Sequence, residues 1–138
     1  MRLAGGEARQ RFGAARVARL ATAGPAGAPH LVPVTFVLHG DHVYTAVDAK
    51  PKSTRDLQRL RDIRAEPRVA VLADHYEEDW DLLWWVRAEG PATILAGASE
   101  MAGPLRLLAG RYEAYRRHPP AGPVIDVEVR RWSGWAAR

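Results

Sequence analysis

Six segments of the sequence have the alternation and residue types of β-strands, and most of them are joined by short turns. They are residues 16–23, 30–38, 43–48, 68–74, 82–94 and 124–135. Helical patterns cover 7–15, 53–66 and 98–117. Only two of the five connections between successive strands contain a helix, whereas a parallel sheet needs a crossover for almost every strand. We therefore predict a mainly β, α+β fold, an antiparallel β-barrel of about six strands with flanking helices.

Length and composition favour one domain that spans residues 1–138. The chain has 47% hydrophobic and 26% charged residues, as in globular proteins with one core. No apolar run approaches the ~20 residues that cross a bilayer, and the first ten residues lack the apolar stretch of an export signal. We therefore expect a cytoplasmic protein without membrane contact.

Several kinds of chemistry are excluded by what the sequence lacks. It has no cysteine, which removes disulfides, thiolate metal sites and thiol nucleophiles. The five histidines have no metal-ligand spacing, so we expect no metal site. The motifs of serine hydrolases, dinucleotide-binding folds and P-loops are absent. The acidic stretch 74–81 is typical of a solvated turn, with paired carboxylates as the alternative.

The positive charge of the chain suggests an anionic ligand or partner. The net charge is +4 and the sequence pI is about 10.0. Ordinary solvated arginines are the alternative explanation. One basic cluster follows a helical pattern rather than a groove, so we expect no nucleic-acid binding. Its members are Arg59, Arg61, Arg64 and Arg68.

The only two lysines, Lys50 and Lys52, lie immediately before a predicted helix start. Ser53 or Thr54 would cap that helix, so free backbone N–H groups and the positive end of the helix dipole would point toward the lysines and Arg55. This arrangement predicts a phosphate-binding site. A capped helix with basic surface residues is the alternative.

Two tryptophans are adjacent in the strand 82–94. Neighbouring side chains on a strand point to opposite faces, so Trp84 and Trp85 cannot both face the same side. One can fill the core, and the other then covers solvent, a partner subunit or a planar ligand. This favours a dimer, although a small barrel that buries both rings is the alternative.

The strand 30–38 has one fully apolar face. Val32, Val34, Phe36 and Leu38 alternate along it and are predicted to face the core. Pro33 has no backbone N–H, so this strand should be an edge, carry a bulge or open at that point.

These motifs together resemble the pyridoxamine 5′-phosphate oxidase-like split β-barrel family, in particular its coenzyme F-420-dependent branch. The resemblance runs from about residue 16 to 135. It is carried by the strand order and by the segments 50–55, 74–80, 83–87 and 132–135. It implies a split barrel that forms a homodimer, with FMN or the deazaflavin F-420 bound at two sites between the subunits.

The resemblance also implies which residues contact the cofactor. One ring-contacting strand corresponds to Pro33, Val34 and Thr35, and the neighbouring strand corresponds to Tyr44, Thr45 and Ala46. The phosphate-binding loop corresponds to residues 50–55, which agrees with the anion site expected from Lys50, Lys52, Ser53, Thr54 and Arg55. Trp84 or Trp85, with Arg87, would reach the cofactor of the partner subunit.

The expected activity is hydride transfer between F-420 and an unsaturated small molecule. The strand 30–38 lacks the basic residue that phosphate-binding flavin enzymes of this superfamily place there, and the chain ends at Arg138 without their longer substrate-binding tail. Oxidation of pyridoxamine phosphate is therefore not expected. An FMN-dependent oxidase or reductase and a non-catalytic binder of flavin, F-420 or tetrapyrrole are the alternatives. No catalytic residue is assigned; Tyr44, His75 and Tyr76 are the candidates for a proton donor.

Overall fold

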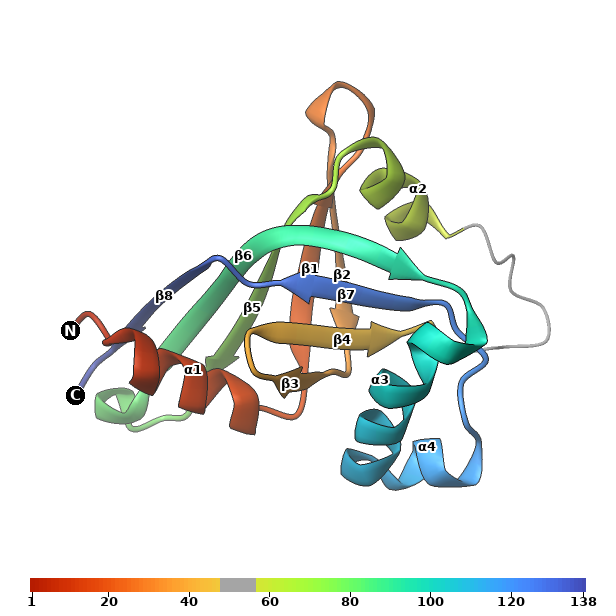
Figure 1. The fold of residues 1–138 in the computed structure, drawn as a ribbon. Helices are drawn as coiled ribbons and strands as arrows, with labels where there is room; N and C mark the ends of the chain where they lie inside the picture. Colours follow the sequence, from red (N-terminus) through yellow and green to blue (C-terminus); the bar gives the residue numbers. More distant parts are fainter. Residues whose placement is uncertain (48–56) are drawn as a thin grey trace.

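The computed structural model describes residues 1–47 and 57–138, and its elements are labelled in Figure 1. The helices are α1 (Gly5–Ala14), α2 (Gln58–Ala65), α3 (Ala98–Arg111) and α4 (Glu113–Arg117), with short 3-10 turns η1 (Pro25–Gly27) and η2 (Trp80–Leu82). The strands are β1 (Ala18–Ala23), β2 (Pro29–Val34), β3 (Val37–His39), β4 (His42–Ala46), β5 (Arg68–His75), β6 (Trp84–Leu95), β7 (Val124–Glu128) and β8 (Arg131–Ala136).

All strand pairs described are antiparallel, which confirms the predicted class. The strands follow the order β2-β1-β5-β6-β7-β4-β3, and β8 pairs with β6 outside this path. The two ends of the path, β2 and β3, are consecutive in the chain and do not pair with each other. The barrel is therefore split between them. Since β2 pairs only with β1, the edge position predicted from Pro33 is confirmed.

The long strand β6 joins the two halves of the barrel. Residues 84–89 pair with β8 on one side, and residues 92–95 pair with β7. Gly90 lies at the change of partner, where the chain passes from β7 to β8. A Cβ atom on Gly90 would lie 1.9 Å from the carbonyl oxygen of Glu128, so this approach requires glycine.

The structure has eight strands rather than about six because two predicted strands are each divided. The predicted strand 30–38 is interrupted at Thr35 and Phe36, where side chains replace a neighbouring strand as hydrogen-bond partners. The Phe36 N–H donates to the Tyr112 hydroxyl (3.1 Å), and Arg111 donates to the Phe36 carbonyl oxygen (3.1 Å). The predicted strand 124–135 divides between β7 and β8, and the predicted helix 98–117 divides at Tyr112.

The core fills the barrel and its two ends. Phe12 of α1 is fully buried against Phe36, with ring centroids 4.9 Å apart, and it meets the edge of Trp132 of β8 at 5.2 Å. At the other end, α2 buries Leu60 and Ile63. Helix α3 lies beside β3, β4 and β7, and α4 packs against α3 (Figure 1). The helices therefore leave uncovered one broad face of the sheet.

The predicted start of the second helix was wrong. Helix α2 begins at Gln58, because Leu57 before it has an extended backbone (φ −71°, ψ 151°). The predicted capping residues Ser53 and Thr54 lie outside the described residues. Asp62 of this helix is buried with 1% of its surface exposed, because Thr22 of β1 and Gln58 of α2 provide hydrogen-bond donors for it.

Candidate functional site

One row of side chains crosses five strands on the outer face, the side of β2, β1, β5, β6 and β8 that points away from the core. Directly paired residues of antiparallel strands have their side chains on the same face. The strand registers therefore place five residues in this row, which are Pro33, Arg19, Leu72, Arg87 and Ser133. Pro33, expected at the cofactor ring, and Arg87, expected at the cofactor of the partner, thus share one face of one chain.

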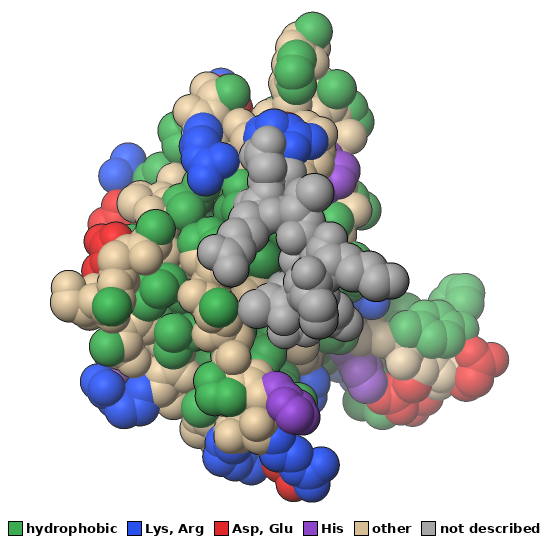
Figure 2. Space-filling model, turned by 90° about the vertical axis from the view of Figure 1, so that its right-hand side faces the viewer, with side chains coloured by type: hydrophobic (Ala, Val, Ile, Leu, Met, Phe, Trp, Pro, Cys, Tyr) green, Lys and Arg blue, Asp and Glu red, His purple; other side chains and the backbone are tan. Residues whose placement is uncertain are grey.

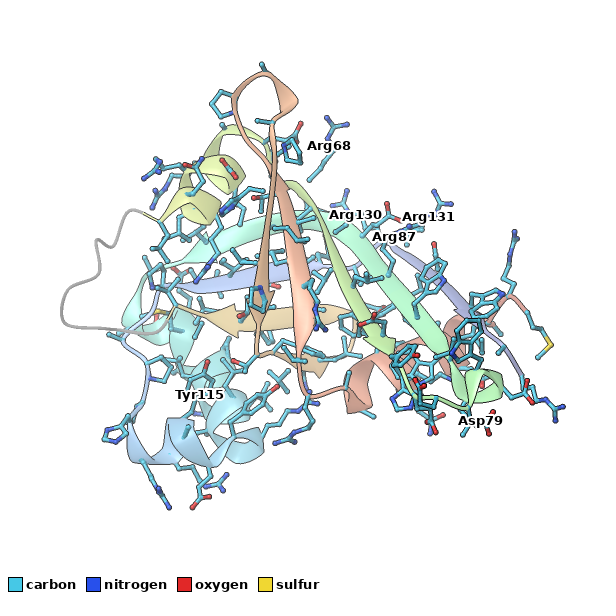
Figure 3. All side chains as sticks on the ribbon, turned by 180° about the vertical axis from the view of Figure 1, so that it is seen from behind. Arg68, Asp79, Arg87, Tyr115, Arg130 and Arg131 are labelled. Atoms are coloured by element: carbon cyan, nitrogen blue, oxygen red, sulfur yellow. The ribbon has the colours of Figure 1, made fainter. Side chains whose placement is uncertain are left out.

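The outer face combines apolar and charged side chains, and Leu31, Ala70 and Leu72 are among the apolar ones. Leu31 is 65% exposed, and it belongs to a parallel row with Ala21, Ala70 and Glu89. No described helix lies over this face, which is turned toward the viewer in Figure 3. An exposed apolar surface with charged margins is typical of an interaction site.

The three residues expected on the ring-contacting strand do not point the same way. Pro33 is exposed on the outer face, whereas Val34 is buried in the core with 8% exposure. The Thr35 hydroxyl lies 2.6 Å from the hydroxyl of Tyr115 on α4. Only Pro33 and Thr35 therefore offer side chains to a ligand outside the barrel.

Tyr44 and Thr45 are also separated, since they are adjacent on β4. Thr45 is buried inside the barrel with 5% exposure. Tyr44 lies opposite Val37 and lines a groove of about 330 Å³ beside Gly103 and Pro104 of α3. Burial raises the pKa of the Tyr44 phenol, and the carboxylate of Asp126 adds to the rise. The phenol therefore keeps its proton at neutral pH and can act as a donor.

The surroundings of the hydrogen bond between Thr35 and Tyr115 were not identified from the sequence as part of a site. Arg59, in the first turn of α2, is half-buried and in electrostatic contact with the Tyr115 phenol. Burial lowers the pKa of Arg59, which still carries its charge near neutral pH. Tyr112 and Tyr115 are three residues apart within the predicted helix 98–117, a spacing that by itself is typical of a core-facing stripe. A half-buried cation next to Tyr115 gives no local sequence signal.

The predicted phosphate site cannot be placed. Lys50, Lys52, Ser53, Thr54 and Arg55 all lie outside the described residues. The described chain stops at Val47, whose N–H donates to the carbonyl oxygen of Pro123 (2.9 Å), and resumes at Leu57 before α2. Figure 2 shows this side of the molecule, with basic side chains above and below and acidic side chains toward its margins.

A buried polar network joins α2 to the hairpin of β1 and β2. Asp62 accepts hydrogen bonds from the Thr22 hydroxyl (2.7 Å) and the Gln58 amide (2.6 Å). These bonds, the one from Thr22 above all, lower the pKa of Asp62 although burial opposes them. Nδ1 of His30 lies 3.7 Å from the Asp62 carboxylate and is buried without a hydrogen-bond partner among the described residues. The network fixes the position of α2, which follows the predicted phosphate-binding loop 50–55 in the chain.

The two adjacent tryptophans face opposite sides, as predicted. Trp84 packs against the core, stacks on His75 with ring centroids 6.2 Å apart, and lies 5.9 Å from the guanidinium of Arg11. Trp85 is on the outer face, directly opposite Trp135 of β8. The interpretation in which both rings are buried in the core is therefore wrong.

The other candidate proton donors lie at the tip of the β5–β6 hairpin. His75 is hydrogen-bonded to Glu77, and the Tyr76 hydroxyl donates to Glu78 (2.6 Å). The hairpin tip is exposed, which confirms a solvated acidic turn. His75 ends β5 and Tyr44 lies on β4, and β6 and β7 separate these two strands in the sheet (Figure 1). One chain therefore does not bring His75 and Tyr76 together with Tyr44.

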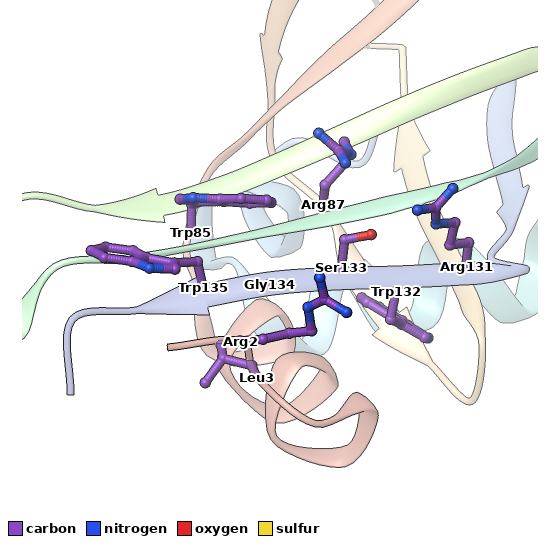
Figure 4. A pocket seen from close by; sticks show the side chains of 9 residues that line it. All are labelled: Arg2, Leu3, Trp85, Arg87, Arg131, Trp132, Ser133, Gly134 and Trp135. Carbon is purple, nitrogen blue, oxygen red and sulfur yellow. The ribbon is translucent and has the colours of Figure 1, made fainter.

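A groove of about 420 Å³ lies at the corner of the outer face, between β6, β8 and the first residues of the chain (Figure 4). The Arg2 backbone pairs with Trp135, and the Leu3 N–H donates to the carbonyl oxygen of Gly134 (2.9 Å). Its lining comprises Arg2, Leu3, Trp85, Arg87, Arg131, Trp132, Ser133, Gly134 and Trp135. The groove thus adds aromatic and basic side chains to the end of the row that begins at Pro33.

Two features are missing from the part of the chain that the structure describes. Among residues 1–47 and 57–138, no group of three or more acidic or histidine side chains could hold a metal ion. In the same ranges, every helix is too short or too polar to cross a membrane.

Comparison with solved structures shows the same fold in proteins of low sequence identity. The conserved hypothetical protein Rv2991 from Mycobacterium tuberculosis has a TM-score of 0.78 at 23% identity over 99% of this chain and 86% of its own. An FAD-binding protein from Mesorhizobium loti has a TM-score of 0.75 at 20% identity, covering 97% and 95%. The heme storage protein HutZ from Vibrio cholerae has a TM-score of 0.71 at 14% identity, covering 95% and 90%.

The family comparison covers nearly the whole chain. None of the curated proteins matches this sequence. The profile described as Pyridoxamine 5′-phosphate oxidase, however, matches residues 5–136, from the first helix to the last strand. The chain belongs to the pyridoxamine 5′-phosphate oxidase family, in agreement with its split β-barrel fold.

Proposed function

We propose that this protein is an oxidoreductase that binds coenzyme F-420, with FMN as the alternative, at two sites between the subunits of a homodimer. Membership of the family and the fold shared with an FAD-binding protein support a flavin-type cofactor. The observation that carries the proposal is the row of side chains on the outer face. It contains residues expected on both sides of the cofactor.

Within one chain these residues are too far apart to enclose one ring. Three strand spacings separate Pro33 from Arg87, or about 14 Å at ~4.8 Å each. Leu72 occupies the middle of the row. A second copy related by a twofold axis along β5 would place its β6 and β8 over β1 and β2 of the first copy. Two equivalent sites would result, each with Pro33 on one side and Arg87 or Trp85 of the other copy on the opposite side.

The described residues fit such a cofactor in two respects. Pro33 gives an exposed apolar surface at the edge of the sheet, which suits a flat ring. Arg59 supplies a half-buried cation near Thr35 and Tyr115 for an anionic group. When bound, F-420 supplies a hydride, which adds to one atom of a double bond in the substrate while the other atom takes up a proton.

The protein would position the cofactor and exclude water from its ring. The bond between Thr35 and Tyr115 fixes the end of β2, and the buried Asp62 fixes α2. Trp85 of the other copy would exclude water from the ring. Tyr44, whose phenol keeps its proton, is the candidate donor on the same subunit, while His75 and Tyr76 are the candidates from the partner.

The first experiment titrates the purified protein separately with F-420 and FMN, followed by fluorescence, and measures its mass by sedimentation. We expect tight binding of F-420 by a dimer, and oxidation of the bound reduced cofactor by unsaturated acceptors. Leu31→Glu should weaken both dimerisation and cofactor binding, whereas Ala102→Glu on the exposed side of α3 should change neither. A monomer that binds the cofactor as tightly as the wild type would disprove the shared site.

Non-catalytic binding is the second candidate. A heme storage protein has this fold. Saturable binding of a tetrapyrrole or flavin without turnover of any acceptor would favour this role.

A further inference from the structure

The groove in Figure 4 combines flat aromatic surface with unbalanced positive charge. We propose that it binds a planar small molecule that carries a carboxylate or a similar anionic group. The claim that this molecule is the substrate rests on the proposed function. The claim that the groove binds it does not.

The aromatic part of the groove comes from one cross-strand pair. Trp85 and Trp135 are directly opposite each other on β6 and β8, and Figure 4 shows both rings on the same side of the sheet. Trp135 is 39% exposed, which is high for so large an apolar side chain. The exposed ring of Trp135 and the partly exposed ring of Trp85 offer a conjugated molecule a surface on which to stack.

The basic part of the groove surrounds these rings. The guanidinium of Arg87 lies 5.3 Å from the centre of the Trp85 ring. Arg87 and Arg131 share one carboxylate, that of Glu89, at 3.3 Å and 3.9 Å. Arg2 forms no ion pair with the described residues, so three guanidinium groups are balanced by one carboxylate. The excess of two positive charges favours an anionic ligand.

Ser133 and the geometry of arginine make a carboxylate the best match. The Ser133 hydroxyl lies next to Arg87 across the strands and forms no hydrogen bond with the described residues. A planar guanidinium can donate two parallel hydrogen bonds to a carboxylate, and the hydroxyl can donate a third. The groove volume of about 420 Å³ lies within the range of small-molecule sites.

The position of the groove connects it to the proposed reaction. Ser133 and Pro33 are the two ends of the same row on the outer face. In the proposed dimer the groove of one copy would therefore lie over Pro33 of the other. An unsaturated carboxylate held by the arginines would then be placed next to the cofactor ring.

The test uses the full chain without added cofactor and follows binding of 2-naphthoate by calorimetry, with uncharged 2-naphthamide as the comparison. We expect naphthoate to bind at least tenfold more tightly than the amide. Arg87→Gln and Arg131→Gln should each weaken naphthoate binding by about tenfold, and Trp135→Ala should also weaken it. Arg130→Gln is the matched control, since Arg130 is paired with Glu128 and does not line the groove.

Separate titrations distinguish this site from the cofactor site. Replacing Lys50 and Lys52 by alanine should weaken F-420 or FMN binding and leave naphthoate binding intact, while Arg131→Gln should do the reverse. The proposal is overturned if naphthoate does not bind, if the amide binds equally well, or if Arg87→Gln and Arg131→Gln bind like Arg130→Gln. It is also overturned if these variants change only self-association in sedimentation, because a second copy would then fill the groove.

Discussion

The hydroxyl groups of Thr35 and Tyr115 lie 2.6 Å apart and connect the end of β2 to α4. Both groups are partly buried, so the bond is shielded from solvent. Tyr115→Phe removes it and leaves the Thr35 hydroxyl without this partner. We expect the free energy of unfolding to fall by about 0.5–1.5 kcal/mol, measured by urea denaturation. Tyr76→Phe is the control, since its bond to Glu78 is exposed and should contribute little. Equal losses in the two variants would contradict a special role for the shielded bond.

The buried Asp62 carboxylate should make stability depend on pH. Its hydrogen bonds lower the pKa in the folded state below the ordinary value of 3.8. The ionised form therefore stabilises the fold above that value, and this contribution is lost as the pH falls through the lower folded pKa. Asp62→Asn should remove this part of the acid dependence and cost about 1–3 kcal/mol at pH 7. Urea denaturation from pH 2 upward measures both effects; Glu113→Gln, on the exposed surface of α4, should show neither.

The close approach at Gly90 should not tolerate a side chain. Because an added Cβ would lie 1.9 Å from the carbonyl oxygen of Glu128, the backbone of β6 or β7 would have to move. We expect Gly90→Ala to cost at least about 3 kcal/mol or to prevent folding. Gly103→Ala on α3 provides the comparison, since nothing lies within 4 Å of its Cβ position. That change should stabilise the protein by about 0.5–1 kcal/mol. Thermal denaturation of both variants measures the contrast.

The two adjacent tryptophans should respond differently to replacement by alanine. Trp84 packs against the core, so Trp84→Ala should lower the stability of the chain by about 1.5–3 kcal/mol. Trp85 lies on the outer face, so Trp85→Ala should change unfolding little and should weaken cofactor binding and dimerisation. Denaturation at low protein concentration and a cofactor titration separate the two effects. A large loss of stability for Trp85→Ala in the monomer would show that this ring also belongs to the core.

The sequence predicted those features that depend on local pattern. The alternation of apolar side chains predicted the strands, and the missing N–H of Pro33 predicted that β2 could be an edge strand. The opposite orientations of Trp84 and Trp85 followed from their adjacency. The break at Phe36 was missed because its cause is distant, namely hydrogen bonds from Arg111 and Tyr112.

The candidate site was predictable only in part for the same reason. Pro33 and Arg87 were identified separately, but only the register of five strands places them in one row. The burial of Asp62 could not be predicted, because its donor Thr22 lies 40 residues earlier in the chain. Arg59 was assigned to a basic cluster, although burial beside Tyr115 separates it from the rest.

The contact between Gly90 and Glu128 also has a consequence for folding. Shifting the pairing of β6 by one residue would exchange the faces on which Trp84 and Trp85 lie. Because the two side chains are equally hydrophobic, they contribute little to the energy difference between the native and the shifted register. The shift would also bring Glu89 or Pro91 to the place where only a residue without a side chain fits. The absence of a side chain at Gly90 therefore favours the native register of β6, the longest strand, over the two registers shifted by one residue.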